Sequence, residues 1–304
     1  MVSLPSELSK REALVLKKVA NLCVNPIHEM KNLFISSFLA FKLICNLAIA
    51  QDAGKFDNLE LASTSPEKVK VLELKKQNLE TIPDAVANFA NLQQLDLGFN
   101  RIHTIPSFIC KFNALENISM FRNQLQTIPE CMHNLPTLKS LDLSSNQLTV
   151  WPEGLNHLHE LVSLNLRGNG LSVIPDIVGD LGSLEYLDVS GNGVSKILND
   201  IKDCESLKRL ILFNNKLREV PDGLGKLKQL EELDLTGNEL TVLPKSMGKL
   251  KNLKVLKIGN NKIHEWPAFI ENLENLELLV ITGNPGLRPP PPTKFKKPKK
   301  LRIQ

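Results

Sequence analysis

One stretch of the sequence, LQQLDLGFN at residues 92–100, recurs along most of the chain with the same spacing of leucines and asparagine. The unit reads L-x-x-L-x-L-x-x-N-x-L-x-x-L-P and returns every 23 residues without an insertion. A fixed period of this length requires stacked copies of one small unit, because a single unit cannot bury its own apolar face. The copies begin at Val69, Leu92, Leu115, Leu138, Leu161, Leu184, Leu207, Leu230, Leu253 and Leu276.

This pattern resembles the leucine-rich repeat family, whose period is about 20 to 29 residues. The resemblance covers residues 69 to about 287, and the 23-residue length and closing proline, as in Ile82-Pro83, are similar to the intracellular Ras-associated type. It implies an α/β solenoid, with a curved parallel sheet on the concave face and short helical turns on the convex face. The resemblance also implies that the asparagine of each unit caps backbone groups of neighbouring turns.

The physical reading of the unit agrees with this fold. Its fourth and sixth positions, such as Leu95 and Leu97, point inward from a short strand, while the third, fifth and seventh point outward by the period-two rule. Apolar residues at the eighteenth and twenty-first positions, such as Ile109 and Phe112, should hold the convex side against the sheet. We therefore expect residues 69–287 to form one solenoid of ten repeats, the last of them truncated.

Residues 1–68 are expected to form a helical amino-terminal cap and a connector. A capping box at residues 9–12 predicts a helix over about 9–24, and a second helix should span about 28–50. Residues 51–68 are polar and are interpreted as a connector into the first strand.

The second predicted helix has a strongly apolar segment at residues 33–50. Lys42 disfavours a membrane span there, and polar residues fall along one side of the helix, as in a helix laid on a larger core. A solenoid needs such a cap, because its first repeat would otherwise expose an apolar end. A partner-binding helix and membrane association are the alternatives.

Residues 288–304 form a proline-rich basic tail without an acidic residue. The prolines at residues 289–292 should hold its charges away from the solenoid. The tail is interpreted as a solvated segment that shields the last repeat, with nuclear targeting, anionic-lipid contact or weak nucleic-acid contact as alternatives. The residues for an anionic contact are Lys294, Lys296, Lys297, Lys299, Lys300 and Arg302.

The five cysteines show no paired spacing, and the cysteine-rich caps that the resemblance implies for an extracellular member are absent from the sequence. We therefore expect reduced thiols and a cytoplasmic protein, or a host-cytosolic one if the chain is a translocated bacterial effector. Cys204 stands at a repeat position that is elsewhere leucine or phenylalanine, so it should be a small core residue.

No motif for nucleotide, cofactor or metal binding occurs in the sequence. His157 and His159 could share a metal ion, but they are better interpreted as solvent-exposed residues. The chain is therefore expected to be neither an enzyme nor a cofactor or metal protein.

Large outward side chains on the concave face are the candidate binding residues, because such side chains anchor protein interfaces. The alternative is that the rings pack along neighbouring side chains without a partner. The candidates are Phe99, Phe121, Arg122, Arg167, Tyr186, Arg209, Ile211 and Phe213. A row of outward aspartates in every second repeat is either a generic polar face or a stripe for a basic partner, and consists of Asp96, Asp142, Asp188 and Asp234.

The sequence thus predicts a monomeric, non-catalytic protein-binding module, a scaffold or adaptor that docks a folded protein on its concave face. The resemblance implies a small GTPase, a phosphatase or another enzyme as partner. Alternatives are a direct inhibitor or regulator of a partner enzyme, including a bacterial effector or an effector antagonist, and a membrane-associated adaptor that uses the basic tail. Specific nucleic-acid binding is not expected, because the tail has no interleaved aromatic residue except Phe295.

Overall fold

The computed structural model describes residues 54–290 and 301–304. The chain divides into two compact units, Met1–Lys55 and Phe56–Gln304. Almost all of the first unit lies outside the described residues, and the second unit carries every repeat.

The predicted helices over residues 9–24 and 28–50 lie outside the described residues. Within the part of the chain that is described, no helix combines the length and apolar character that a bilayer crossing requires.

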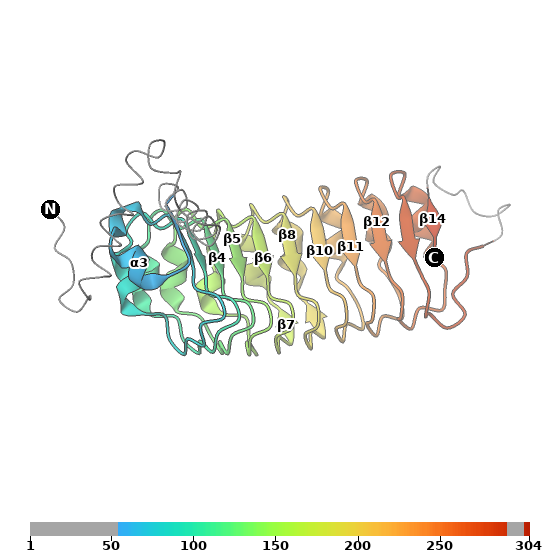
Figure 1. Ribbon diagram of the computed structural model, residues 1–304. Helices are drawn as coiled ribbons and strands as arrows, with labels where there is room; N and C mark the ends of the chain where they lie inside the picture. Colours follow the sequence, from blue (N-terminus) through green and yellow to red (C-terminus); the bar gives the residue numbers. More distant parts are fainter. Residues whose placement is uncertain (1–53, 291–300) are drawn as a thin grey trace, which may run out of the picture. The chain divides into compact units, whose positions relative to one another are not determined.

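A single parallel sheet of twelve strands runs through the solenoid (Figure 1). Each of the ten repeats supplies one strand, and β1 and β14 stand at the two ends of the sheet. Adjacent strands pair in the register of the sequence period, so that Leu95 lies beside Ile118 and Leu141 beside Leu164. The strands are β1 (Lys55–Phe56), β2 (Val71–Glu73), β3 (Gln94–Asp96), β4 (Asn117–Ser119), β5 (Ser140–Asp142), β6 (Ser163–Asn165), β8 (Tyr186–Asp188), β10 (Arg209–Ile211), β11 (Glu232–Asp234), β12 (Val255–Lys257), β13 (Leu278–Val280) and β14 (Arg302–Ile303).

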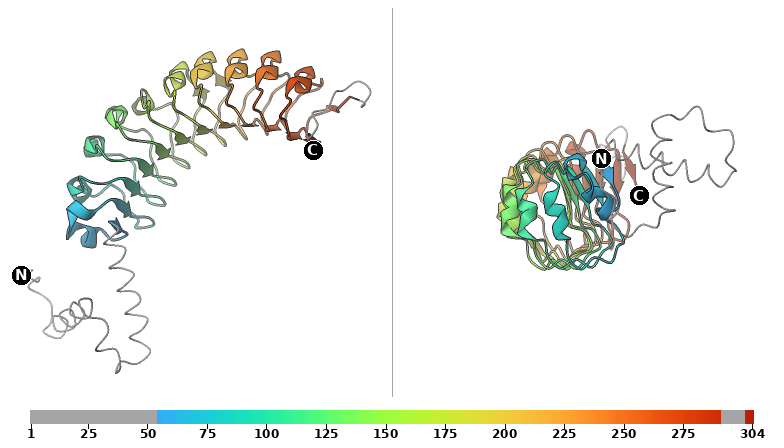
Figure 2. Two further views of the ribbon diagram at one scale, coloured as in Figure 1. Left: turned by 90° about the horizontal axis from the view of Figure 1, so that it is seen from above. Right: turned by 60° about the vertical axis from the view of Figure 1, so that its left-hand side comes forward.

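Short 3-10 helices form the other side of each repeat. In the view from above, the repeats follow an arc with the strands on its inner side and the helices on its outer side (Figure 2). The prediction of a concave sheet and convex helical turns is confirmed. The helices are η1 (Pro66–Lys68), η2 (Asp84–Asn88), η3 (Ser107–Lys111), η4 (Glu130–Asn134), η5 (Glu153–Leu155), η6 (Asp176–Asp180), η7 (Asn199–Asp203), η8 (Asp222–Lys226), η9 (Lys245–Lys249) and η10 (Ala268–Asn272).

The core is a continuous column of inward side chains between the sheet and the 3-10 helices. The inward positions behave as predicted: Leu95 and Leu97 are buried, and Ile109 and Phe112 hold the convex side. Cys204 is fully buried as predicted, with its Sγ 3.1 Å from the Val178 carbonyl oxygen. Each such side chain contributes about 1.5 to 3 kcal/mol of hydrophobic stabilisation.

The repeated asparagine closes each turn by hydrogen bonds. Asn146 Nδ2 donates to the carbonyl oxygens of Met120 at 3.0 Å and Leu143 at 2.9 Å, and its Oδ1 accepts from the Leu125 N–H at 3.0 Å. One side chain thus satisfies buried backbone groups of two successive repeats, as the resemblance implied. The same arrangement recurs at Asn100, Asn123, Asn169, Asn192, Asn215, Asn238, Asn261 and Asn284.

The missing proline of the sixth repeat creates a second small sheet. Leu198 stands where most repeats carry proline, and its N–H donates to the Ile174 carbonyl oxygen at 3.0 Å, a bond that proline cannot make. β7 (Val173–Ile174) accordingly pairs in parallel with β9 (Lys196–Ile197).

The predicted polar connector is more structured than expected. It contains α3 (Leu59–Ser63), whose first turn is capped by the Asn58 side chain accepting from the Leu61 N–H at 2.9 Å. Phe56 and Ala62 are buried against the first repeat. The connector prediction missed these two inward residues because they precede the periodic part of the sequence.

The end of the basic tail also differs from the prediction. The tail was expected to stand away from the solenoid, but Leu301 is only 2% exposed and β14 pairs with β13. The Arg302 N–H donates to the Glu277 carbonyl oxygen at 2.8 Å, and the Ile281 N–H donates to that of Gln304 at 2.7 Å. Burial of the apolar Leu301 and pairing with the free edge of β13 therefore bring the end of the tail back to the solenoid, although the proline run is stiff. Residues 291–300 lie outside the described part.

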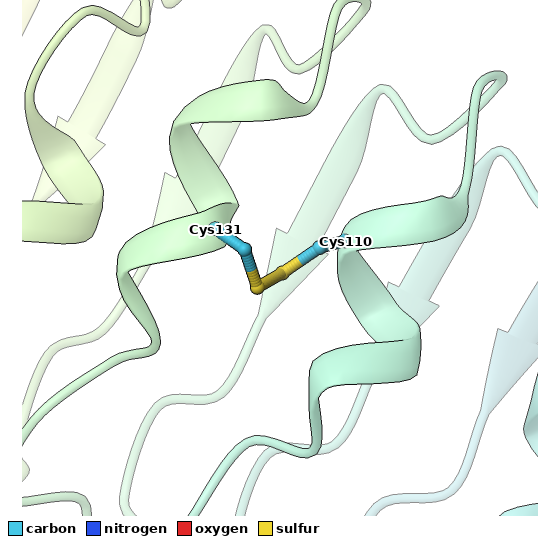
Figure 3. Close-up of a disulfide and its surroundings, with 2 residues drawn as sticks. All are labelled: Cys110 and Cys131. Atoms are coloured by element: carbon cyan, nitrogen blue, oxygen red, sulfur yellow. A yellow bond between two sulfur atoms is a disulfide. The ribbon is translucent and has the colours of Figure 1, made fainter.

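Two cysteines of adjacent repeats form a disulfide, which corrects the prediction of unpaired cysteines and reduced thiols. Cys110 of η3 and Cys131 of η4 are joined with an S–S distance of 2.07 Å and a Cα–Cα distance of 5.7 Å (Figure 3). The two residues are 21 positions apart, two fewer than the period, so they stand at different repeat positions on neighbouring helices. Reduced thiols therefore no longer support a cytoplasmic location, which stays a prediction.

Candidate protein-binding face

The concave face of the sheet is covered by no second layer among the described residues (Figure 2). Its outward side chains come from the strands and from the loop that follows each strand. The predicted binding residues fall into two clusters on this face, with a few residues outside both.

The first cluster lies over repeats one to three and is built around Phe99 and Phe121. Their ring centroids are 4.6 Å apart in an edge-to-face arrangement. The Phe121 ring occupies the space above Gly98, where an added Cβ would come within 2.5 Å of it. Both rings are half-buried and pack against each other, while binding of a partner by this pair stays a prediction.

Two cations lie against the Phe99 ring. Lys76 Nζ is 5.2 Å from the ring centroid and Arg122 Cζ is 4.9 Å from it, both within the range of a cation–π interaction. Repeats one, two and three thus each contribute one side chain to a cation–aromatic–cation stack.

All three stacked residues have left-handed backbone conformations, with φ of 57° at Lys76, 57° at Phe99 and 53° at Arg122. They stand at the eighth position of the repeat, where the fifth and later repeats carry only glycine or asparagine. A bulky residue in this region costs about 1 to 3 kcal/mol. The first four repeats, with Ser145 in the fourth at φ 55°, therefore carry a backbone strain that the fifth and later repeats reduce.

The second cluster lies over repeats six to nine and centres on Tyr186 and Arg209. The Arg209 guanidinium is 5.2 Å from the Tyr186 ring centroid, and its Nε donates to Glu232 Oε2 at 2.9 Å. Lys257 Nζ donates to Glu232 Oε1 at 2.8 Å and lies 3.4 Å from Asp234 Oδ2. Internal ion pairs therefore neutralise the charges of this cluster.

The electrostatics of the second cluster follow from these contacts. Burial alone would raise the pKa of Glu232, but hydrogen bonds from Lys257 and Arg209 outweigh it and hold that pKa below its ordinary value. Burial and the neighbouring Asp188 raise the pKa of Tyr186 to about 12. Tyr186 is therefore a neutral hydrogen-bond donor at physiological pH.

The row of aspartates has a structural function that the sequence reading did not foresee. The same carboxylate oxygen, Oδ1, accepts the backbone N–H two residues later: Gly98 for Asp96, Ser144 for Asp142, Ser190 for Asp188 and Thr236 for Asp234. One oxygen of each carboxylate therefore shapes the loop after its strand. The stripe for a basic partner stays a prediction.

The other predicted residues lie outside the two clusters' contacts. Phe213 is 42% exposed, Arg167 is exposed and Ile211 is half-buried between Asp188 and Asp234 in the sheet register. Among the tail residues, Arg302 is exposed on β14, while the five tail lysines lie outside the described residues. The five lysines are Lys294, Lys296, Lys297, Lys299 and Lys300.

His157 and His159 do not form a metal site with a third ligand. His157 Nδ1 lies 3.1 Å from Asp180 Oδ2, and His159 Nδ1 lies 3.0 Å from the Asp180 carbonyl oxygen. No group of three metal-ligating side chains occurs in residues 54–290 and 301–304.

Three residues of the clusters were missed by the sequence reading: Lys76, Glu232 and Lys257. Lys76 could have been found by comparing the eighth position along all repeats. It stands there with Phe99 and Arg122, whereas the fifth and later repeats carry glycine or asparagine. Glu232 and Lys257 carry no such signal, because charged residues are ordinary at outward strand positions.

Comparison with known protein families supports the assignment of this region to leucine-rich repeats. A family described as "Leucine rich repeat" matches residues 92–148 and 159–217, and one described as "Leucine-rich repeat region" matches residues 194–289. No curated protein matches the sequence.

Solved structures give the same result. A leucine-rich repeat protein of Leptospira interrogans is 30% identical with a TM-score of 0.73, over 82% of this chain and 69% of that chain. The ectodomain of the Arabidopsis thaliana receptor kinase GASSHO1/SCHENGEN3, solved in complex with CASPARIAN STRIP INTEGRITY FACTOR 2, is 29% identical with a TM-score of 0.66, over 77% of this chain and 28% of that chain.

A third structure is similar in fold alone. It is an octameric complex of Latrophilin 3, Unc5D and the repeat domain of FLRT2, and its matched chain is 24% identical with a TM-score of 0.69, over 81% of this chain and 78% of that chain. With ten in-register units, a buried asparagine ladder and a relative at 30% identity, the chain belongs to the leucine-rich repeat family.

Proposed function

We propose that the chain is a non-catalytic binding module that docks a folded protein on the concave face of repeats two to seven. The observation that carries the proposal is Phe213, a phenylalanine 42% exposed in the same repeat as Arg209, whose guanidinium contacts the Tyr186 ring. Aromatic residues and arginine are the side chains that most often dominate interface energies.

The second cluster is arranged as a rigid contact surface. Tyr186 is held by its hydrogen bond to Asp188 and by the Arg209 guanidinium, while Arg209 is held by Glu232. Side chains that are already ordered lose little conformational entropy on binding, which favours affinity. A folded partner with a complementary convex surface therefore fits this face better than a small ligand does.

The comparisons support a protein as the partner. The Arabidopsis receptor and the FLRT2 repeat domain were both solved in complexes with proteins or peptides, as their descriptions state. Within this class we favour a scaffold or adaptor whose partner is a small GTPase, a phosphatase or another enzyme. A scaffold leaves the activity of its bound partner unchanged, whereas an inhibitor abolishes it, so an activity assay on the captured partner decides between them.

The test is affinity capture from a native lysate, followed by mass spectrometry, with the wild-type chain and the Tyr186→Ala/Phe213→Ala variant. A true partner should be retained about tenfold or more weakly by the variant, since each hot spot contributes about 2 kcal/mol.

A matched control is Val150→Ala/Val242→Ala. These valines are 66% and 64% exposed and lie at the thirteenth repeat position, away from the concave strands. Capture should be unaffected by this change. Equal capture by the wild type and the folded Tyr186→Ala/Phe213→Ala variant would exclude the concave middle as the site.

A further inference from the structure

The first cluster differs from the second in whether its cations form ion pairs with carboxylates. Lys75 of the first repeat is paired with Asp96 at 2.8 Å, and Arg209 and Lys257 are paired with Glu232. Among the residues that the structure describes, no ion pair involves Lys76 or Arg122. Their charges face an aromatic ring and solvent.

Both cations lie against the same ring, that of Phe99. Each lies about 5 Å from the same ring centroid, as measured at 5.2 Å for Lys76 and 4.9 Å for Arg122. The two charges therefore cannot be farther apart than the sum of these distances. Two positive charges within about 10 Å of each other, neither of them in an ion pair with a carboxylate, both attract a ligand that brings negative charge.

The fold sets the backbone conformation at this repeat position. Lys76, Phe99 and Arg122 stand at the eighth position, which is left-handed in every repeat, whether the residue there is large, serine, glycine or asparagine. In the first three repeats this position therefore carries large side chains where the backbone favours glycine or asparagine. The ladder bond from the Phe99 N–H to the Phe121 carbonyl oxygen, at 2.9 Å, holds the conformation in place.

We propose that Lys76, Phe99 and Arg122 form a receptor for an acidic segment of the protein partner, with carboxylates bound by the two cations. The identity of the partner rests on the proposed function, but the binding chemistry does not. The second cluster would then supply apolar and aromatic contacts, while the first selects partners by charge. A nucleic acid could also supply negative charge, and the test includes it as an outcome.

The test uses the full chain and a fluorescein-labelled oligoglutamate peptide, with binding followed by fluorescence anisotropy. The decisive variant is Lys76→Asn/Arg122→Asn, because asparagine tolerates the left-handed conformation while losing the charge. We expect its affinity for oligoglutamate to fall about tenfold or more. Its melting temperature should stay the same or rise, which separates a binding role from a structural one.

The matched control is Lys226→Asn/Lys249→Asn, which removes the same charge from exposed lysines of η8 and η9 on the convex side. Oligoglutamate affinity should be unchanged in this control, and a neutral oligoglutamine peptide should not bind the wild type. Phe99→Gly supplies an independent variant: both cations remain, the left-handed position is relieved, and affinity should fall several-fold.

Two results would overturn the proposal. One is an equal loss of oligoglutamate affinity in the concave and convex double variants, because binding would then follow net charge alone. The other is tighter binding of a uridine oligonucleotide than of oligoglutamate with the same dependence on Lys76 and Arg122. The Tyr186→Ala/Phe213→Ala variant should bind oligoglutamate normally. The anisotropy assay therefore tests the site of Lys76, Phe99 and Arg122 independently of the proposed docking face, which the capture experiment tests.

Discussion

The Tyr186 hydroxyl donates a hydrogen bond to Asp188 Oδ2 at 3.2 Å, while Asp188 Oδ1 accepts the Ser190 N–H at 2.8 Å. One carboxylate therefore fixes both the tyrosine and the loop that follows its strand. Because this carboxylate is negative, ionising the tyrosine beside it is costly.

We predict that Tyr186 titrates near pH 12, since burial and Asp188 raise its pKa to about 12. The sequence has a single tyrosine, so tyrosinate absorbance reports this group alone. Asp188→Asn should lower the midpoint towards the ordinary value of about 10 without reaching it, because burial remains. A midpoint near 10 in the folded wild type would contradict the arrangement.

The same shift carries a consequence for stability. The unfolded chain loses the tyrosine proton near pH 10, before the folded chain does. The contribution of Tyr186 is thus fully present at neutral pH and is lost as the pH rises towards about 12. Urea unfolding measured on both sides of this window should show a steeper loss in the wild type than in Tyr186→Phe.

Reduction of the Cys110–Cys131 disulfide should destabilise the solenoid. The bond closes a loop of 21 residues, for which chain entropy gives roughly 3 kcal/mol. Chemical denaturation with and without a reducing agent measures the effect. Cys110→Ser/Cys131→Ser should show the reduced stability under both conditions, and a wild-type midpoint insensitive to reductant would argue against the bond.

Gly225→Ala should be strongly destabilising, whereas Gly182→Ala should be tolerated. A Cβ at Gly225 of η8 would collide with the Ser246 carbonyl oxygen of η9, while one at Gly182 meets nothing within 4 Å. Overpacking of this kind costs about 1 to 3 kcal/mol. Thermal melts of the two variants provide the measurement, and equal melting temperatures would show that the helices can separate.

Leu301→Ala should lower stability by about 2 kcal/mol or more, because the leucine is 2% exposed at the end of the core. Arg302→Ala, one residue away, should change stability by less than about 0.5 kcal/mol, because its side chain is exposed. Similar unfolding midpoints for the two variants would mean that β14 does not close the solenoid.

The sequence predicted the parts of the structure that follow from its period. The strand register, the buried asparagines such as Asn146 and the convex contacts of Ile109 all follow from spacing, because every copy meets its neighbours in the same way.

The features that break the period could not be predicted. Cys110 and Cys131 meet although they occupy different repeat positions. β14 pairs with β13 at a separation of 24 residues, one more than the period, so that Arg302 lies beside Leu278. The loop bond of Asp188 and the ion pairs of Glu232 depend on side-chain geometry that spacing does not fix. The sequence thus predicted that the candidate site lies on the concave face. It did not predict that this face carries two clusters of different charge.

Uniform spacing also poses a problem for the folding chain. A segment that docked a full 23 residues out of place would still present leucines to the core and asparagine to the next turn. Only contacts unique to one copy reveal such an error, and the pairing of Gly98 with Phe121 is one of them, because a side chain in place of this glycine would displace the ring. These irregular contacts therefore specify the register in which otherwise interchangeable repeats dock.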